Sequence, residues 1–185
     1  IVIEDRWAGG KTDRLPALAA ELVRLKVDAI FTQSWPAAVA AKQATTTIPI
    51  VIVSAGDPVG TGLVQSLARP GGNVTGLGDL SPELSAKRLE LLKEAVPKLS
   101  RVAVLWNAGD SGMTLRMRAI QAASRPLGVT VRPLGVHSLE DFEVAFTAMT
   151  QERPDALFVV ADPLVTGNRK RILDFTAKHR LPAMY

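Results

Sequence analysis

The sequence contains no cysteine among its 185 residues. Disulfide bridges, thiolate nucleophiles and zinc sites built from cysteine are therefore excluded. Aromatic residues make up only 5% of the chain, which is few for a surface that stacks nucleic-acid bases. The sequence has no apolar run near the roughly 20 residues that span a bilayer and no recognisable signal peptide.

A strong charge of one sign is also missing. Twenty-two Lys and Arg residues stand against 18 Asp and Glu residues, which gives a net charge of +4. Arg169, Lys170 and Arg171 form the only basic triplet, and we expect it to be a solvated helix face rather than a nucleic-acid-binding patch. These features predict no nucleic-acid partner.

Signatures of catalysis, metal binding and cofactor binding are absent as well. The two histidines, His137 and His179, stand alone without the spacing of metal ligands. No G-x-S-x-G elbow, Walker A motif or G-x-G-x-x-G motif is present. We therefore predict no catalytic residues, no metal site and no cofactor.

What the sequence does have is a regular alternation of strand-like and helix-like segments. Leucines and alanines at three- and four-residue steps predict a helix over 14–25, and the β-branched run 48–54 predicts a buried strand. The same reasoning predicts a strand over 1–4 and a short helix over 59–67. Strands that alternate with helices form parallel sheets with right-handed crossovers.

The alternation runs through two cycles. The sequence therefore predicts an α/β fold with two Rossmann-like lobes, each a parallel sheet flanked by helices. A glycine-rich strand gives way to a new helix near residue 78, so we place lobe one at 1–78 and lobe two at 79–185.

Ligands of such sheets bind beyond the carboxyl ends of the strands. The residues that follow the predicted strands are small or polar, and they lead into helices whose N-terminal N–H groups favour anions. The predicted ligand-binding residues are Ser34, Trp35, Ser54, Gly56, Asp57, Asn107 and Asp162.

Each of these residues also has a purely structural interpretation. The serine, aspartates and asparagine could cap helices or form turns, and Trp35 could pack at the edge of a lobe. We expect Trp7 and Trp106 in the core or at an interface.

Several runs of sequence match a known family. They include Gly56-Asp57-Pro58-Val59 and, most specifically, the run Ala-Arg-Pro-Gly-Gly-Asn-Val-Thr-Gly at 68–76. With these runs the sequence resembles the ABC transporter substrate-binding proteins of the family that includes tryptophan- and phenylalanine-binding members. The resemblance extends over essentially the whole chain.

The resemblance implies a type I periplasmic-binding-protein fold whose two lobes close on a solute. It implies an exported protein, periplasmic or held at the cell surface as a lipoprotein, that delivers solute to an ABC permease. Contact with the membrane would come only through the permease or a lipid anchor outside this sequence. By the same pattern the first strand and helix of lobe one would precede Ile1, and further elements of lobe two would follow Tyr185.

The ligand expected from the residues is an aromatic or branched amino acid, bound in the interlobe cleft. Backbone N–H groups would hold its carboxylate, Asp57 or Asp162 its ammonium group, and Trp35 its apolar part. Two alternatives stay open: the ligand-sensing domain of a transcription regulator with the same fold, and an α/β enzyme that uses Asp57 and Asp162 as an acid/base pair.

Overall fold

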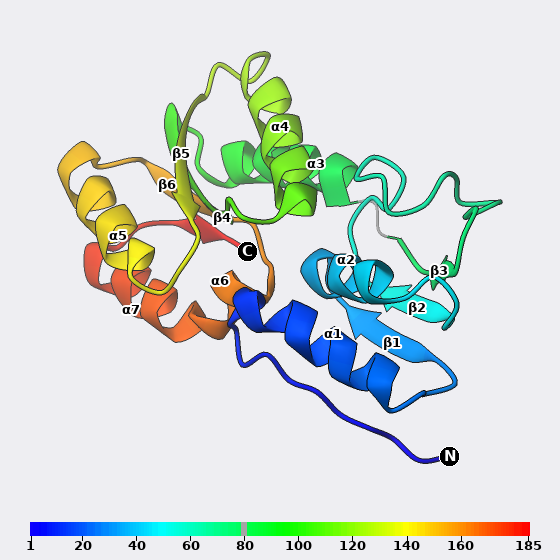
Figure 1. Ribbon diagram of the computed structural model, residues 1–185. Coiled ribbons are helices and arrows are strands. Elements are labelled where there is room, and N and C mark those ends of the chain that lie inside the picture. The colour runs from blue at the N-terminus through cyan, green and yellow to red at the C-terminus, as the bar shows by residue number, and fades with distance from the viewer. Residues whose placement is uncertain (79–80) are drawn as a thin grey trace. The chain divides into compact units, whose positions relative to one another are not determined.

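The computed structural model describes residues 1–78 and 81–185. The chain divides into two compact units, Ile1–Leu80 (unit 1) and Ser81–Tyr185 (unit 2), drawn in Figure 1 from blue to red along the chain. The boundary predicted after residue 78 falls at residues 79–80, which lie outside the described residues.

Unit 1 is built on a three-stranded sheet in the order β1-β2-β3, with all strands parallel. In register, Ile30 lies opposite Ile50, and Ile50 opposite Val74. The elements of unit 1 are η1 (Thr12–Arg14), α1 (Leu15–Arg24), β1 (Ile30–Gln33), α2 (Trp35–Ala44), β2 (Ile50–Val53) and β3 (Val74–Gly76).

One face of this sheet carries the core of unit 1. Ile30, Ile50 and Ile52 are buried there against the small side chains Ala38 and Ala41 of α2, and α1 packs against the same cluster. Alternate residues of each strand point to the opposite face. On that face the Phe31 side chain is 69% exposed, so both helices cover the same side of the sheet.

Unit 2 holds a four-stranded parallel sheet in the order β5-β4-β6-β7. Its elements are α3 (Ser81–Ala95), β4 (Arg101–Asn107), α4 (Ser111–Ser124), β5 (Thr130–Val136), α5 (Asp141–Glu152), β6 (Ala156–Val159), α6 (Pro163–Gly167), α7 (Arg169–His179) and β7 (Ala183–Met184).

Both faces of the unit 2 sheet are covered. Leu105 of β4 packs with Phe142 of α5 and Ile172 of α7 in one core cluster, whereas Val104 packs with Ile120 of α4 in the other. Figure 1 shows α3 and α4 on one side of this sheet and α5 and α7 on the other. Continuous apolar strands are what a parallel sheet buried on both faces requires. The predicted α/β class with helix-flanked parallel sheets is confirmed.

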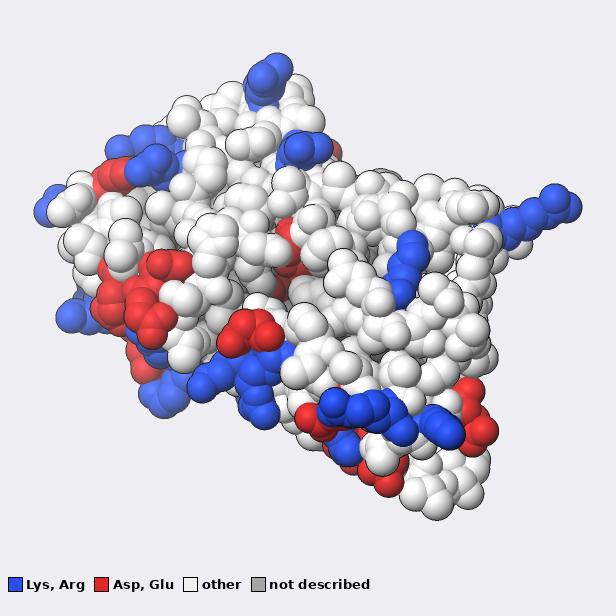
Figure 2. Space-filling view, in the orientation of Figure 1, with Lys and Arg blue, Asp and Glu red and all other residues white. Residues whose placement is uncertain are grey.

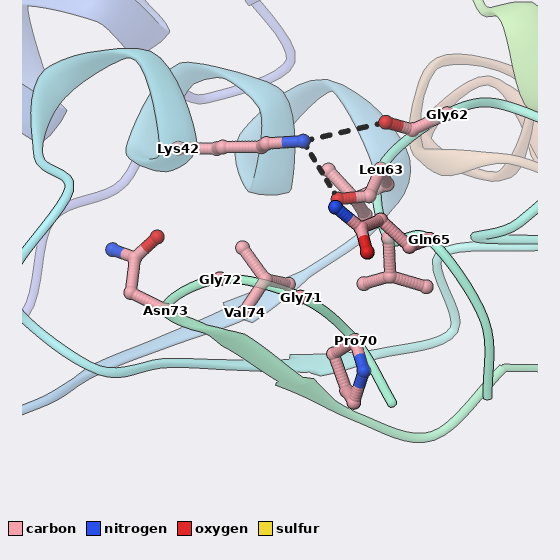
Figure 3. A pocket seen from close by; sticks show the side chains of 10 residues that line it. Lys42, Gly62, Leu63, Gln65, Pro70, Gly71, Gly72, Asn73 and Val74 are labelled. Carbon is pink, nitrogen blue, oxygen red and sulfur yellow. Dashed lines mark hydrogen bonds between the residues drawn. The ribbon is translucent and has the colours of Figure 1, made fainter. Parts of the chain in front are cut away.

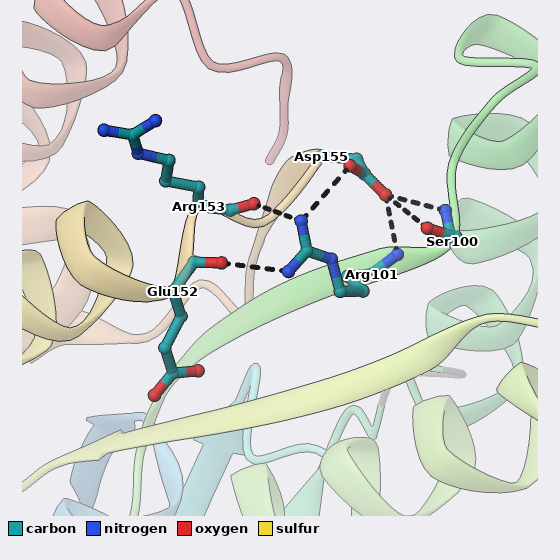
Figure 4. A network of polar contacts seen from close by, with 5 residues as sticks. All are labelled: Ser100, Arg101, Glu152, Arg153 and Asp155. Carbon is teal, nitrogen blue, oxygen red and sulfur yellow. Dashed lines mark hydrogen bonds and ion pairs between the residues drawn. The ribbon is translucent and has the colours of Figure 1, made fainter.

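A polar network ties the amino ends of β4 and β6 together (Figure 4). One carboxylate oxygen of Asp155 accepts hydrogen bonds from the backbone N–H groups of Ser100 and Arg101 and from the Ser100 hydroxyl, at 2.8 to 2.9 Å. The Arg101 guanidinium donates to the backbone oxygens of Glu152 and Arg153. These bonds lower the pKa of Asp155, the Ser100 N–H contributing most. The network lies at the end of the sheet opposite to the predicted site residues.

Two local predictions are wrong. Residues 1–4 form no strand, and Ile1, Val2 and Ile3 are exposed, because this segment pairs with no strand among the described residues. Residues 59–67 form turns instead of a helix. Gly62 adopts φ +71° there, a left-handed conformation that interrupts a helix. Trp7, expected in the core or at an interface, is 78% exposed and therefore lies outside the core of unit 1, whereas a place at an interface stays a prediction.

The charged surface fits the expectation from composition. Arg171 pairs with Glu143 and Lys170 with Asp174, each at 2.7 Å, so the basic triplet lies on a solvated helix face. Figure 2 shows basic and acidic side chains interspersed on the face in view. Among the helices of the described residues, none combines the length and the apolar composition needed to cross a membrane.

Candidate functional site

Two serines mark the carboxyl edge of the unit 1 sheet. Ser34 follows β1 and Ser54 follows β2, and the backbone N–H of Ser34 donates to the Val53 oxygen at 3.2 Å. Both serines have positive φ, +81° and +54° respectively. Non-glycine residues in this region are uncommon, cost about 1 to 3 kcal/mol each, and cluster at functional sites. The sheet thus holds two adjacent hydroxyl-bearing residues in strained conformations at one edge.

The N-terminus of α2 opens on the same edge. Ser34 occupies the N-cap position, yet its side chain makes no capping hydrogen bond within the described parts of the chain. Trp35 begins the helix, half-buried, and its indole N–H is buried without an acceptor among the described residues. Because a buried indole N–H usually finds a partner, this edge offers unused donors to a ligand.

Asp57 and Gly56 form the next loop of this edge. The Asp57 carboxylate accepts hydrogen bonds from the N–H groups of Val59 at 3.0 Å and Gly60 at 2.8 Å. Gly56 is buried with φ +68°, a conformation that glycine adopts without strain. One carboxylate oxygen of Asp57 therefore stabilises the turn formed by residues 57–60.

Unit 2 brings Asn107 and Asp162 together at the carboxyl ends of β4 and β6. The Asn107 amide donates to one Asp162 oxygen at 2.5 Å, and the other oxygen caps α6 by accepting from the Val165 N–H at 2.8 Å. Both side chains are buried, Asp162 being 8% exposed. The hydrogen bond between Asn107 and Asp162 thus joins the ends of the two strands.

Two further charged residues join this pair, and sequence reasoning did not assign them to the site. Asp110, 1% exposed, caps α4 through the N–H groups of Gly112 at 2.7 Å and Met113 at 3.3 Å. Arg116 of α4 is 9% exposed, and its guanidinium donates to the Ala161 oxygen at 3.2 Å. The sequence signal for Arg116 was its place within the apolar stripe of α4, where a charge needs a partner.

Burial dominates the electrostatics of this cluster. Loss of solvent raises the pKa of Asp110 and of Asp162, while hydrogen bonds from backbone N–H groups and the charge of Arg116 oppose that rise. The positive charge of Arg116 thus acts on the carboxylates of both Asp110 and Asp162. The helix N-termini of α4 and α6 are already occupied by these carboxylates, so they are poor places for a ligand carboxylate.

A cavity of about 310 Å³ lies at the other end of unit 1. It is lined by the run at 70–74 and by Lys42, whose ammonium donates to the Gly62 and Leu63 oxygens at 3.3 and 2.8 Å (Figure 3). Asn73 there donates to the backbone oxygens of Thr45 and Ile48. The most family-specific run of the sequence thus builds a structural turn, and no predicted ligand-binding residue lines this cavity.

Comparison of the sequence with models of known families identifies the family over nearly the whole chain. The sequence model of the family described as ABC transporter substrate binding protein matches residues 3–185. The chain belongs to this family. The predicted resemblance is confirmed.

Relatives of this substrate-binding protein chain support the assignment. The tyrosine-binding protein of Clostridioides difficile strain R20291 is 30% identical over 167 residues, which are 90% of this chain and 47% of that protein. The chain thus spans about half the length of the curated relative it matches.

Two solved structures are similar over 94% of this chain. The ABC domain from Streptococcus pneumoniae in complex with L-Trp aligns with a TM-score of 0.86 and 25% identity, over 59% of that chain. A conserved domain protein from Vibrio cholerae aligns with a TM-score of 0.87 and 29% identity, over 58% of that chain.

The predicted site residues of this substrate-binding chain fall into two sets. Ser34, Trp35, Ser54, Gly56 and Asp57 follow neighbouring strands of unit 1, as the position rule for parallel sheets requires. The other two, Asn107 and Asp162, meet in unit 2. That the two edges share one cleft stays a prediction.

Proposed function

We propose that the protein is the extracytoplasmic solute-binding component of an ABC importer, that it binds an amino acid with an aromatic side chain, and that it catalyses no reaction. The observation that carries the ligand class is the carboxyl edge of unit 1. Ser34 and Ser54 lie there beside the uncapped N-terminus of α2, a setting that suits a carboxylate. The family relatives include a tyrosine-binding protein and a domain bound to L-Trp.

Each part of such a solute has a counterpart among these residues. The hydroxyl groups of Ser34 and Ser54 and the first N–H groups of α2 would donate to the carboxylate. Trp35 offers an apolar ring surface and an indole N–H without an acceptor among the described residues. Asp57 keeps one carboxylate oxygen outside its turn bonds, available for an ammonium group. The bound protein would then deliver the amino acid to the permease.

The experiment is a calorimetric titration of the complete protein with L-tyrosine, L-tryptophan and L-leucine. Because a hydrogen bond to a charged group contributes about 1.5 to 3 kcal/mol, Ser34→Ala and Ser54→Ala should each weaken binding about tenfold or more. Thr46→Ala is the matched control, since Thr46 is an exposed hydroxyl residue between α2 and β2, at the opposite edge of the same sheet.

The control variant should bind like the wild type. Absence of binding to all three amino acids, together with binding of sugars or purines, would remove the ligand class. Unchanged affinity in both serine variants would remove the proposed site.

A further inference from the structure

We infer that Arg116 is a positioning residue for Asn107 and Asp162, the two predicted ligand-binding residues of unit 2, an inference that rests on the proposed function. Arg116 is buried in α4, and its guanidinium donates to the Ala161 oxygen at 3.2 Å. Ala161 lies two residues after the end of β6 and is exposed. Arg116 therefore holds the backbone at the strand end without lying at the surface itself.

The position of Arg116 in its helix is unusual for a charged residue. It lies on the buried face of α4 with Met113, Met117 and Ile120. A buried guanidinium is tolerated only when it is paired and hydrogen-bonded. The energetic cost of placing it there is offset by its hydrogen bond to the Ala161 oxygen and by the charges of two buried carboxylates, Asp110 and Asp162.

The segment at 161–162 is held from three elements. Arg116 reaches it from α4, the Asn107 amide from the end of β4, and the Val165 N–H from α6. Removal of Arg116 removes the contact that reaches this segment from α4. A predicted solute contact such as Asp162 needs fixed geometry of this kind, because a misplacement of about 1 Å is enough to weaken a polar site strongly.

The charge of Arg116 has a second role. Among the described residues, the titratable groups on which its charge acts include Asp110, which caps the same helix, and Asp162, which follows β6. His137, which follows β5, is exposed near Gly109. Without the guanidinium, the two buried carboxylates would repel each other whenever both are ionised. Because burial raises the pKa of both carboxyl groups, this repulsion would weaken as the pH falls and strengthen as the pH rises.

The test compares the complete protein with Arg116→Met, Arg116→Lys and the matched control Arg118→Met. Arg118 lies on the same helix and is exposed. The dissociation constant for L-tyrosine and L-tryptophan is measured by calorimetry at about pH 5.5 and about pH 8. The melting temperature is measured under the same conditions.

Arg116→Met should weaken binding about tenfold at the alkaline pH and clearly less at the acidic pH. Arg116→Lys keeps the charge but loses the fork geometry of arginine, so it should bind about three- to tenfold more weakly with the wild-type pH profile. Arg118→Met should match the wild type at both pH values.

The inference is overturned if Arg116→Met matches Arg118→Met at both pH values. If Arg116→Met does not fold, Arg116→Lys decides, and a dissociation constant equal to that of the wild type overturns the inference. A wild-type protein that binds none of the amino acids contradicts the proposed function instead, so the two failures are distinguishable.

Discussion

The Asn107 amide donates to the Asp162 carboxylate across 2.5 Å and so joins the ends of β4 and β6 in unit 2. The second oxygen of the same carboxylate caps α6. A residue expected to contact solute therefore acts first as a connection between two strands and a helix. The predicted solute-contacting residues of unit 2 thus belong to a cluster that is already internally bonded.

Asp162→Ala should lower the free energy of unfolding by about 2 to 4 kcal/mol, because it removes the cap of α6 and leaves the buried Asn107 amide without its acceptor. Urea denaturation followed by circular dichroism measures this. Asp162→Asn keeps an oxygen for the Val165 N–H and should lose clearly less. Equal losses in the two variants would show that the cap contributes nothing.

Asp110→Asn tests the electrostatics of the cluster. Burial raises the pKa of Asp110 above its ordinary 3.8 in the folded protein, so the folded state binds the proton more tightly than the unfolded state. The contribution of this group to stability is fully present below pH 3.8 and is lost as the pH rises through the folded-state pKa.

Asparagine caps a helix about as well as aspartate and does not titrate. The stability of Asp110→Asn relative to the wild type should therefore increase from acidic to neutral pH. Urea midpoints in a pH series check this, and a difference that stays constant with pH would contradict it.

Asp155→Ala should have the opposite pH dependence. Its carboxylate accepts from two N–H groups and a hydroxyl at the start of β4, and these bonds lower its pKa below 3.8 in the folded state. The stability it contributes is present above the unfolded-state pKa and is lost as the pH falls through the folded-state pKa.

The variant should lose about 1 to 2 kcal/mol of unfolding free energy at neutral pH, with the difference from the wild type shrinking below about pH 4. Asp174→Ala is the matched control. Asp174 pairs with Lys170 on the surface of α7, so its removal should change stability by about 0.5 kcal/mol at most.

Gly76→Ala should destabilise the chain by more than about 2 kcal/mol. Gly76 has φ +138°, and a Cβ there would collide with the carbonyl oxygen of Ile52, which accepts the β-sheet bond from Leu77. Gly72→Ala is the control, since a Cβ at that position meets no atom within 4 Å. Melting temperatures of the two variants should differ clearly, and equal temperatures would contradict the steric argument.

The order of strands and helices was determined by the sequence itself. Apolar runs of period two and apolar stripes of period three to four are local properties, and they predicted the parallel α/β fold and the edge at which Ser34 and Ser54 lie. The same local reasoning failed at 1–4 and at 59–67. A strand needs a neighbour that only the sheet supplies, and the positive φ of Gly62 is a property of its loop.

The roles of individual polar residues were decided by the tertiary structure alone. Asn107 and Asp162 are 55 residues apart in sequence, and no local pattern shows that they bond to each other instead of pointing outward. In the sequence, Arg116 is a single charged residue on an apolar helix face. Only the fold places the backbone oxygen of Ala161, which follows β6, within hydrogen-bond distance of it. Hydrogen bonds between distant residues depend on how the strands are ordered in the sheet. The sequence could therefore predict a candidate edge but not the hydrogen-bonding role of each side chain there.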